Sequence, residues 1–566
     1  MPDLNPIEIW KAQKHGFDVW PDFLQWSEAG TSYDKISDDD LQRLKWYGVF
    51  WRKHDRNRYM LRVRIPACEM TANQARALAF AAYEAGHEII DVTTRGNIQI
   101  QGLTIEKIPT VITALERTGL TSKQTGLDNI RNVTSHPLAG LDSAELIDTR
   151  EAARAVTALF IDNRQLADLP RKFNISFNGR PDNAAHDWTQ DIAWLAAHGL
   201  DHTIGYRLLV GGMQGQTPHA GWHLPVFVQT AQVSDVTSAI LHLFRDRGSR
   251  SQRRNQVRFR YLVEKLGVDF VLEEIERRIG YSLTRFAEPP PTPTQVESFI
   301  GWFPQHQPGH WAVGVAVPMG RLTWQQFEGI AILARDYGDG TIRTTPDQNL
   351  VLPCIRGSDR AALGTALAAL GLAFDADSLT RQIIACTGKQ FCSLALTEAK
   401  GYGLQLIEDL RRRHVELYGI RIAISGCANA CAQHHTSDIG LRGVRVRQGL
   451  RAIDAFDIYL GGGAGKSTTL ARLYQKGLPV NRIADTLERI VREFHNRRLS
   501  CETFSSYWQR VLAAREPEVI LPEEIPTWHC ATCGYDHIGA SPPGFCPRCA
   551  GVKRQFALQQ SVSAVV

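Results

Sequence analysis

A repeat within the chain is the feature that most constrains its fold. Residues 61–100 and 313–352 align without a gap, and six positions match: Pro66 with Pro318, Thr71 with Thr323, Gln74 with Gln326, Gly86 with Gly338, Thr93 with Thr345, and Asn97 with Asn349. In each copy, apolar alternation predicts a strand, a helix capped by threonine follows, and a second alternating strand ends the unit. The repeat therefore predicts one supersecondary unit that occurs twice in a duplicated core.

The duplication extends beyond this unit in a weaker form. Residues 172–179 resemble 421–428, and residues 206–213 resemble 457–464. Each half is therefore predicted to carry a small βαβ-type unit followed by a larger α+β unit. The stretch EPPPTPT predicts a linker between the halves.

Four cysteines in the second half form two close pairs. Cys386 and Cys392 are separated by five residues, and Cys427 and Cys431 by three. Two such pairs in one segment fit a polynuclear iron–sulfur cluster. A zinc site fits less well, because zinc pairs usually have about two to four residues between the cysteines. Two pairs of buried thiols are the alternative without a metal.

A second set of four cysteines lies at the C-terminus, in WHCATCGYDHIGASPPGFCPRCAG. The set forms two C-x-x-C pairs with twelve residues between them: Cys530, Cys533, Cys546 and Cys549. This spacing predicts a tetrahedral site for one iron or one zinc ion.

Composition and sequence patterns give no support to a nucleic-acid-binding, secreted or membrane protein. The net charge is only +5, so charge is no argument for a nucleic-acid partner. The N-terminus lacks the apolar core of a signal peptide, and no run approaches the roughly 20 apolar residues of a membrane helix. With eleven cysteines, we expect a cytoplasmic protein that uses cysteine for metals rather than disulfides. Three cysteines remain outside the pairs and are read as buried structural thiols: Cys68, Cys354 and Cys501.

The motifs ACTGKQFC and GCANAC together resemble the paired signature of the sirohaem-containing nitrite and sulfite reductases, over residues from about 8 to 520. The resemblance implies that Cys386, Cys392, Cys427 and Cys431 hold a [4Fe–4S] cluster. It also implies that Cys431 bridges the cluster to the sirohaem iron. CGY and CPRC resemble rubredoxin-like modules, which favours iron at the C-terminal site, with zinc as the alternative.

With this resemblance, the expected fold is α+β, with an internally duplicated sirohaem reductase core and a small C-terminal rubredoxin-like domain. The expected limits are 1–115 for an arm and the first ferredoxin-like half-domain, 116–287 for the first sirohaem-binding domain, 288–304 for the linker, 305–378 for the second ferredoxin-like half-domain, 379–520 for the cluster and sirohaem domain, and 526–555 for the rubredoxin-like domain.

The resemblance also implies the roles of individual side chains. Four positions match those that contact the substrate anion: Arg62, Arg131, Lys172 and Asn174. Five more match positions that hold the tetrapyrrole, in addition to Cys431: Thr93, Arg95, Gln99, Arg171 and Asn429. Guanidinium groups suit the carboxylates of sirohaem because they can bind a carboxylate with two parallel hydrogen bonds. A single arginine on a strand would otherwise be read as a solvated surface residue.

Asn174 bears on which anion is reduced. Similar sulfite reductases carry a second lysine at this position, and similar nitrite reductases carry asparagine. Physical chemistry agrees, because a unit charge at ~4 Å contributes about 4 kcal/mol at an effective dielectric of about 20, and a dianion such as sulfite feels it twice. The segment 119–142 also resembles the nitrite branch, since it lacks the cysteines of one sulfite branch.

GGGAGKST, at 461–468, invites comparison with a phosphate-binding loop. That motif requires glycine where this chain has Leu460, so a nucleotide site is not predicted. Lys466 is instead expected near a sirohaem carboxylate.

The sequence thus predicts a nitrite reductase that converts nitrite to ammonia in a six-electron reaction, with a sulfite reductase as the alternative. The expected electron donor is a small protein such as ferredoxin or flavodoxin, and the expected state is a monomer with no nucleic-acid or membrane partner. Two further alternatives are a corrin-pathway oxygenase with the same fold and a zinc-ribbon nucleic-acid binder.

Overall fold

The computed structural model describes residues 4–52, 55–180, 182–290, 298–448, 451–463, 470–514, 527–533, 536–538 and 556–558. The chain divides into two compact units, Met1–Gln509 and Arg510–Val566. Within the described residues, no helix is both long and apolar enough to cross a membrane.

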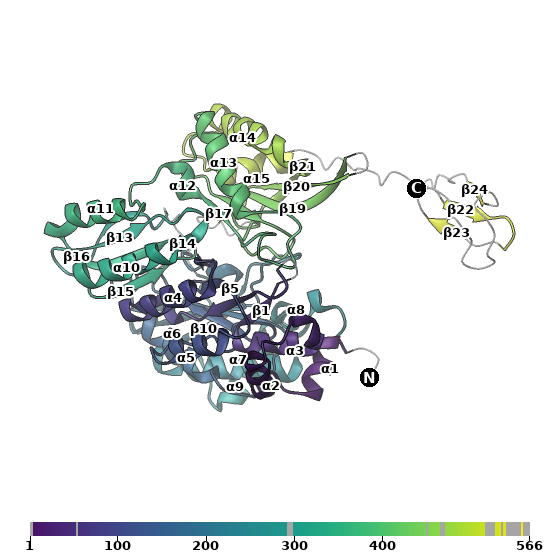
Figure 1. Ribbon diagram of the computed structural model, residues 1–566, viewed down its shortest axis with the longest axis horizontal. Helices are drawn as coiled ribbons and strands as arrows, with labels where there is room; N and C mark the ends of the chain where they lie inside the picture. Colours follow the sequence, from purple (N-terminus) through teal and green to yellow (C-terminus); the bar gives the residue numbers. More distant parts are fainter. Residues whose placement is uncertain are drawn as a thin grey trace. The chain divides into compact units, whose positions relative to one another are not determined.

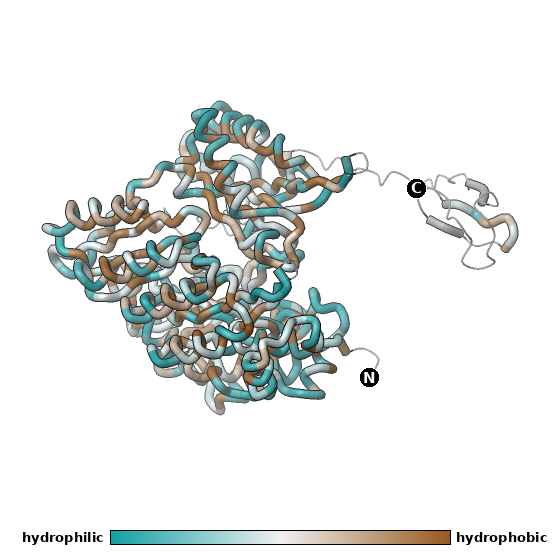
Figure 2. The backbone as a smooth tube through the Cα atoms, viewed as in Figure 1, coloured by the Kyte–Doolittle hydropathy of each residue, from teal (hydrophilic) through white to brown (hydrophobic). Residues whose placement is uncertain are grey.

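An N-terminal helical arm precedes the first sheet. It contains α1 (Pro6–Gln13), α2 (Trp20–Glu28) and α3 (Asp38–Arg43). Its apolar side chains, such as Val19 and Phe23, are buried in the same core as the sheets that follow. In the unit Met1–Gln509, hydrophobic stretches run along the strands, whereas many helix residues that face outward are hydrophilic (Figure 2).

The two copies of the repeat form two antiparallel sheets that exchange a strand (Figure 1). The first sheet has the order β1 (Val49–Trp51), β2 (Tyr59–Val63), β5 (Ile98–Leu103), β4 (Ile89–Val92), β14 (Arg321–Thr323). The second has the order β12 (Gly301–Pro304), β13 (His310–Val315), β16 (Leu350–Arg356), β15 (Thr341–Thr344), β3 (Glu69–Thr71). Each sheet therefore ends in a strand supplied by the other half, and both halves share one hydrophobic core.

The helices of the repeat also correspond. α4 (Ala72–Ala85) and α10 (Trp324–Tyr337) each begin with a capping box, formed by Thr71 with Gln74 and by Thr323 with Gln326. These two helices pack against each other (Figure 1). α5 (Ile108–Glu116) and α11 (Arg360–Ala369) complete the two half-domains. The strand β12 lies inside the range predicted as a linker.

The larger units contain two mixed sheets with matching topology. The first has the order β11 (Thr284–Arg285), β10 (Trp222–Gln229), β9 (Ile204–Val210), β8 (Ile192–His198), β7 (Phe173–Asn178), β6 (Ile130–Thr134). The second has the order β17 (Ile383–Ala385), β18 (Ile422–Ser425), β19 (Ile439–Gln448), β20 (Arg451–Leu460), β21 (Arg472–Pro479). In both, three parallel strands are followed by antiparallel ones. The weak repeat predicted β7 as the counterpart of β18 and β9 as that of β20, and the topology agrees.

Helices accompany both sheets. They are α6 (Arg150–Phe160), α7 (Val233–Arg247), α8 (Phe259–Leu266) and α9 (Val268–Ile279) in the first domain, and α12 (Ser378–Gln382), α13 (Lys400–Arg412), α14 (Ile483–Arg497) and α15 (Phe504–Ala514) in the second half of the chain. The predicted α+β class with a duplicated core is confirmed. The six domain limits stay predictions.

The C-terminal unit contains a three-stranded sheet with β22 (Thr527–Cys530) between β23 (Asp536–Ile538) and β24 (Phe556–Leu558). Cys530 lies at the end of β22 and is buried. Cys546 and Cys549 lie outside the described residues, as does Lys466, so the predicted four-cysteine site and the lysine position stay predictions.

Candidate functional site

Two adjacent parallel strands bring the cysteine pairs of the second half together. Cys386 follows β17, and Cys427 follows β18, its parallel neighbour. The backbone N–H of Cys386 donates to the carbonyl of Ile424 at 2.9 Å, and the N–H of Gly426 donates to the Cys386 thiol at 3.1 Å. The site therefore forms at the carboxyl ends of strands, where open sheets commonly bind ligands.

Glycine is required in both cysteine loops. Gly388 has a positive φ of 71°, and a Cβ there would lie 2.5 Å from the backbone nitrogen of Ala399. A Cβ on Gly426 would lie 2.9 Å from the carbonyl oxygen of Thr397. These close approaches explain the glycines in ACTGKQFC and SGCANAC, since any side chain would push the loops apart.

The thiols influence one another electrostatically. Burial raises the pKa values of Cys386, Cys392 and Cys427, the last to about 11, and the charge of Cys431 raises all three further. Within the described residues, no three Cys, His, Asp or Glu side chains are placed to hold a single metal ion. Four thiols close enough to act on one another fit a polynuclear cluster, which would bind them as thiolates.

A group of cations gathers beside Cys431. Arg62 on β2 and Arg131 on β6 both donate to the carbonyl oxygen of Thr125, at 3.0 and 2.6 Å. Arg131 also donates to the carbonyl of Leu127 at 2.8 Å. The Arg62 guanidinium lies 4.5 Å from the centre of the Phe50 ring. Backbone carbonyls and an aromatic face thus orient two guanidinium groups without neutralising them.

Burial and mutual repulsion perturb these cations strongly. The pKa values of Arg131 and Lys172 are lowered well below their ordinary values, first by burial and then by neighbouring arginines. Burial also lowers the pKa of Arg95 to about 10 and reduces that of Arg62, whereas the charge of Cys431 raises both. Cations that repel one another in a buried place favour an anion among them.

Asn174 lies on β7 with its side chain turned away from the apolar core. It is 1% exposed, and neither atom of its carboxamide has a hydrogen-bond partner within the described residues. Its backbone N–H donates to Asp191 at 2.8 Å, and Arg258 pairs with the same carboxylate at 2.7 Å. An unsatisfied buried amide is costly, so a bound ligand is the expected partner.

Hydrogen bonds orient three of the residues that are predicted to hold the tetrapyrrole. Arg95 donates to the side-chain oxygen of Gln190 at 2.8 Å. Thr93 builds the turn beneath it, because its hydroxyl accepts from the N–H groups of Arg95 and Asn97. Gln99 lies between Arg62 and Thr387, at 3.0 and 3.3 Å when its amide oxygen is oriented toward the arginine.

Two other predicted residues sit at the edge of the group. The Arg171 guanidinium is oriented toward Asp128, at 3.5 Å. Asn429 is exposed and hydrogen-bonds to the Cys427 thiol, which lowers the pKa of that thiol against the effect of burial. Cys431 itself is exposed, as a thiol that must reach a second group would be.

Some contributors were not predicted. Thr94 Oγ1 donates to the carbonyl of Cys431 at 2.8 Å and so joins the first half to the cysteine loop. The buried Lys400 pairs with Asp91 at 3.3 Å, and Asp91 also pairs with Arg321. Their only sequence signal was proximity: Thr94 adjoins Arg95, and Lys400 follows the cysteine motif. Cys501 was expected to be buried but is exposed, and Cys354 is half-buried, whereas Cys68 is buried as predicted.

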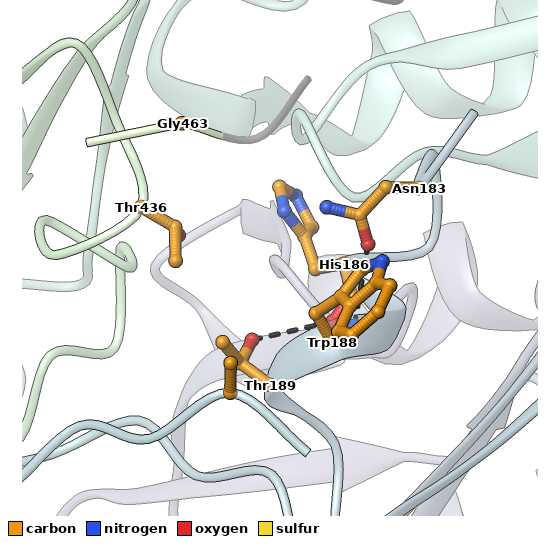
Figure 3. Close-up of a pocket in the computed structure, with 7 residues that line it drawn as sticks. Asn183, His186, Trp188, Thr189, Thr436 and Gly463 are labelled. Atoms are coloured by element: carbon orange, nitrogen blue, oxygen red, sulfur yellow. Dashed lines mark hydrogen bonds between the residues drawn. The ribbon is translucent and has the colours of Figure 1, made fainter. Parts of the chain in front are cut away.

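A pocket lies next to Arg95 and is lined by Asn183, His186, Trp188, Thr189, Ala220, Thr436 and Gly463 (Figure 3). Gln190, which accepts from Arg95, donates to the carbonyl of His186 at 3.1 Å. Burial and two arginines lower the pKa of His186 well below its ordinary value, so its ring is neutral. The ring Nδ1 has no partner within the described residues. The pocket therefore places uncharged polar side chains beside the cationic group, linked to Arg95 through Gln190.

The residues present therefore fit both implied groups. Four thiols of suitable arrangement fit an iron–sulfur cluster. The buried cations and the unpartnered amide of Asn174 fit a carboxylate-rich tetrapyrrole and an anionic substrate.

Comparison with known proteins identifies the family. The profile described as the nitrite and sulphite reductase 4Fe-4S domain matches residues 126–283 and 376–500. The profile described as the nitrite/sulfite reductase ferredoxin-like half domain matches residues 51–118 and 303–370. The chain belongs to the nitrite and sulphite reductase family.

Individual members of the family match over most of their length. A ferredoxin–nitrite reductase from Leptolyngbya laminosa is 34% identical over 87% of this chain and 97% of that protein. A sulfite reductase [ferredoxin] from Mycolicibacterium paratuberculosis is 30% identical over 87% and 92%. The solved structure of the Mycobacterium tuberculosis NirA protein has a TM-score of 0.84 and 27% identity, covering 90% of this chain and 96% of that one. The family accounts for the duplicated half-domains and for the motif that carries the four cysteines.

Proposed function

We propose that this protein is a ferredoxin-dependent nitrite reductase that converts nitrite to ammonia. The observation that carries the proposal is the buried neutral amide of Asn174, which lies two residues after Lys172, a cation whose pKa is lowered by burial and by three neighbouring arginines. A fifth cation at this position would favour a dianion, whereas an amide leaves the charge suited to a monoanion. The naming of the relatives supports nitrite and ferredoxin over sulfite.

The cofactors in this proposal are sirohaem and a [4Fe–4S] cluster held by Cys386, Cys392, Cys427 and Cys431. When bound, sirohaem would supply the iron that accepts nitrite, and the cluster would pass on, one at a time, the six electrons that the donor delivers. Arg95, with Gln190 behind it, is placed to hold a carboxylate of the tetrapyrrole. Gln99 keeps the Arg62 guanidinium in place at the same boundary between the halves.

The chain's own side chains bind the anion and supply protons. Arg62 and Arg131, fixed by the carbonyl of Thr125, orient the oxygens of nitrite. Lys172 acts as the proton donor, because a strongly lowered pKa lets its Nζ release a proton to a departing oxygen and recover one from water. Asn174 can donate and accept at the same site without adding charge.

The proposal is tested by steady-state turnover of the purified holoenzyme with nitrite and with sulfite, using electrochemically reduced viologen. We expect ammonia as the product and a kcat/KM for nitrite that exceeds that for sulfite. A larger kcat/KM for sulfite, with sulfide as the product, would assign the chain to the other branch of the family.

We further propose that the C-terminal module, with Cys530, Cys533, Cys546 and Cys549, binds one iron and admits electrons from the donor. Two C-x-x-C pairs on an enzyme that needs six electrons support this role, and structural zinc is the alternative. Deleting residues from 525 onward should leave the sirohaem and cluster spectra and the viologen-linked activity intact. Turnover with reduced ferredoxin should fall more than about tenfold, equivalent to ~1.4 kcal/mol of barrier. Zinc in the isolated module, or unchanged ferredoxin-linked turnover, would refute the electron-entry role.

A monomeric state and a cytoplasmic location belong to the same proposal. Cysteine pairs of the metal-binding type need a reducing compartment, which supports the location. Sedimentation of the holoenzyme at several concentrations would detect an oligomer.

A further inference from the structure

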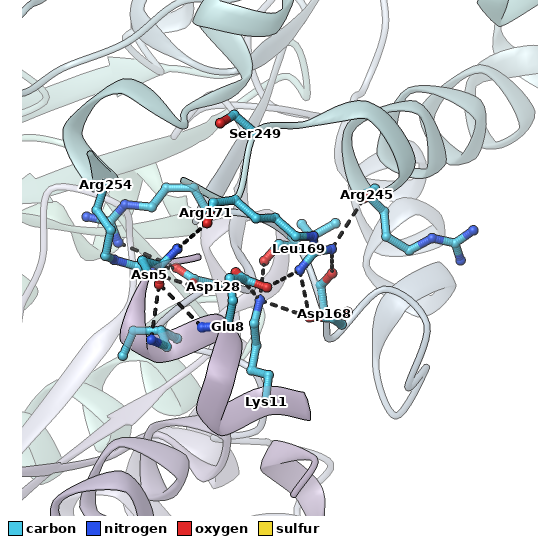
Figure 4. Close-up of polar contacts among 12 residues, drawn as sticks. Asn5, Glu8, Lys11, Asp128, Asp168, Leu169, Arg171, Arg245, Ser249 and Arg254 are labelled. Atoms are coloured by element: carbon cyan, nitrogen blue, oxygen red, sulfur yellow. Dashed lines mark hydrogen bonds and ion pairs between the residues drawn. The ribbon is translucent and has the colours of Figure 1, made fainter. Parts of the chain in front are cut away.

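The N-terminal arm contacts the chain segments that carry the predicted anion-binding cations (Figure 4). Lys11 on α1 donates to the carbonyl of Leu169 at 3.0 Å and pairs with Asp168 at 2.9 Å. Arg250 joins Asp168 to Glu8 of the same helix. Only Pro170 separates the contacted Asp168 and Leu169 from Arg171 and Lys172 in the sequence.

Asn5 is the centre of the arm's attachment. It is 0% exposed, and its Oδ1 accepts from the N–H groups of Ile7 and Glu8 at 3.1 and 3.3 Å, so that it caps α1. The same oxygen accepts from Arg254 at 2.9 Å. Its Nδ2 donates to the carbonyl of Arg250 at 2.9 Å. One buried amide therefore ties the start of the helix to the turn at 250–254.

Arg254 continues this chain of contacts to the cation group. Its Nη2 lies 2.6 and 2.9 Å from the two carboxylate oxygens of Asp128, which is 0% exposed. Arg171, one of the predicted tetrapyrrole ligands, approaches the same carboxylate at 3.5 Å. Asp128 thus faces two guanidinium groups and is held closely by Arg254.

Asp128 lies in the segment 125–131, which orients two of the substrate cations. The carbonyl of Thr125 accepts from Arg62 and Arg131, and that of Leu127 accepts from Arg131. The Asn129 side chain closes the turn by donating to the carbonyl of Gly126 at 2.9 Å. A shift of Asp128 would therefore move the carbonyls that aim both guanidinium groups.

We propose that Arg254 is a positioning residue for the anion site. Together with Asn5 it fixes the Asp128 carboxylate. Through that carboxylate it sets the placement of Arg131 and determines how closely Asp128 pairs with Arg171. This inference rests on the proposed reduction of a small anion. It gives the N-terminal arm a role in substrate binding as well as in packing.

Removal of the Arg254 charge has two consequences. Asp128 loses its closest partner and pairs more fully with Arg171, which draws that guanidinium away from the tetrapyrrole that it is predicted to hold. The segment 125–131 also loses its outer anchor. The loss of this anchor weakens the binding of nitrite more than it slows the subsequent chemistry, because segment 125–131 orients the anion-binding Arg62 and Arg131, whereas the proposed proton donor Lys172 lies outside it.

The test compares Arg254→Gln with Arg43→Gln in the holoenzyme. Arg43 is a matched control because it also stabilises the arm, donating to the carbonyls of Trp10 and Lys14 at 2.8 and 3.1 Å. Its other side-chain partners within the described residues are Asp39 and Asp40, so it contacts neither segment 125–131 nor residues 168–172. We expect Arg254→Gln to raise the KM for nitrite about tenfold with less than a twofold change in kcat. Arg254→Lys should recover part of the loss, and Arg43→Gln should leave the KM unchanged.

Hydrogen–deuterium exchange supplies a readout that does not depend on activity. Arg254→Gln should speed exchange of the amides in 125–131, and Arg43→Gln should speed it only in the arm. Equal changes in KM and exchange for the two variants would mean that the arm acts through general stability, and the inference would be wrong. An unchanged KM in Arg254→Gln would also refute it. A wild-type enzyme without nitrite turnover would instead refute the proposed function.

Discussion

The identity of residue 174 is expected to control the choice between nitrite and sulfite, and Asn174→Lys tests this directly. The side chain is 1% exposed and has no partner within the described residues, so a replacement does not break an existing hydrogen bond. Its backbone stays fixed by the N–H contact to Asp191. A lysine at this position would add a cation to the group that contains Lys172 and the nearby arginines.

The size of the effect follows from the charges of the two anions. At ~4 Å and an effective dielectric of about 20, one added charge attracts a monoanion by about 4 kcal/mol and a dianion by twice that. The difference, up to ~4 kcal/mol, corresponds to nearly three decades in relative affinity. Burial and the neighbouring Arg258 and Arg95 lower the pKa of Lys172 well below its ordinary value, and the same factors oppose the charge of a second lysine, so this difference is an upper bound. We therefore expect the sulfite-to-nitrite ratio of kcat/KM to rise by about tenfold or more.

The assay measures kcat/KM for both anions with electrochemically reduced viologen, because dithionite itself releases sulfite. Asn174→Met is the matched control, since methionine has nearly the length of lysine but no charge. The sirohaem absorption band must be intact in both variants. If the ratio rises equally in Asn174→Met, or fails to rise in Asn174→Lys, then charge at this position does not set the preference.

Three further outcomes are expected. Cys431→Ser should lose both the cluster and the sirohaem absorption band, whereas Cys68→Ser should keep both; iron, sulfide and spectral analysis of the purified variants would decide. Asp91→Asn should destabilise the protein by about 3–5 kcal/mol, because it leaves the buried Lys400 without its carboxylate; the midpoint of urea unfolding measures this, and a loss under about 1 kcal/mol would contradict it. Burial raises the pKa of Asp187 to about 6, so folding favours the protonated form. Its contribution to stability is full below about pH 4 and lost as the pH rises through about 6. Asp187→Asn should therefore reduce the fall in thermal midpoint between pH 5 and pH 7.5, and an unchanged profile would exclude this group as the cause.

The duplicated fold was predictable because the repeat preserves local signals in both copies. The capping boxes at Thr71 and Thr323 and the alternating strands depend only on neighbouring residues, so one sequence window contains them. The exchange of β3 and β14 was not predictable from the same windows. It depends on which edge of which sheet a three-residue strand joins, and each of these strands pairs with residues of the other half.

The candidate site was predictable to a similar degree. The motifs predicted Arg62, Arg131 and Lys172 as one group; in the structure Arg62 lowers the pKa of Arg131, and the charge of Cys431 acts on both Arg62 and Lys172. The orientation of Arg171 toward Asp128 was not predictable, because Asp128 is held by Arg254, which in turn donates to Asn5, and both lie far away in sequence. The roles of all these residues in binding and catalysis stay predictions.

The exchanged strands also explain how two halves of common origin recognise each other. In the alignment of the repeat, Glu69 corresponds to Arg321, and Asp91 corresponds to Arg343. The sheet registers place Arg321 opposite Asp91 and Arg343 opposite Glu69, and both pairs form salt bridges. Each half thus carries one sign of charge at both positions.

Two identical halves would place like charges opposite each other at both of these positions, acidic with acidic or basic with basic. Like charges directly opposite on paired strands are destabilising. The divergence of sign therefore favours pairing of the first half with the second over pairing of either half with itself. A core made of unlike halves is what the site needs, because Arg62 and Arg95 come from the first half and the four cysteines come only from the second. The same interface that selects the unlike partner brings Thr94 to the carbonyl of Cys431, so correct pairing of the halves and assembly of the site are one event.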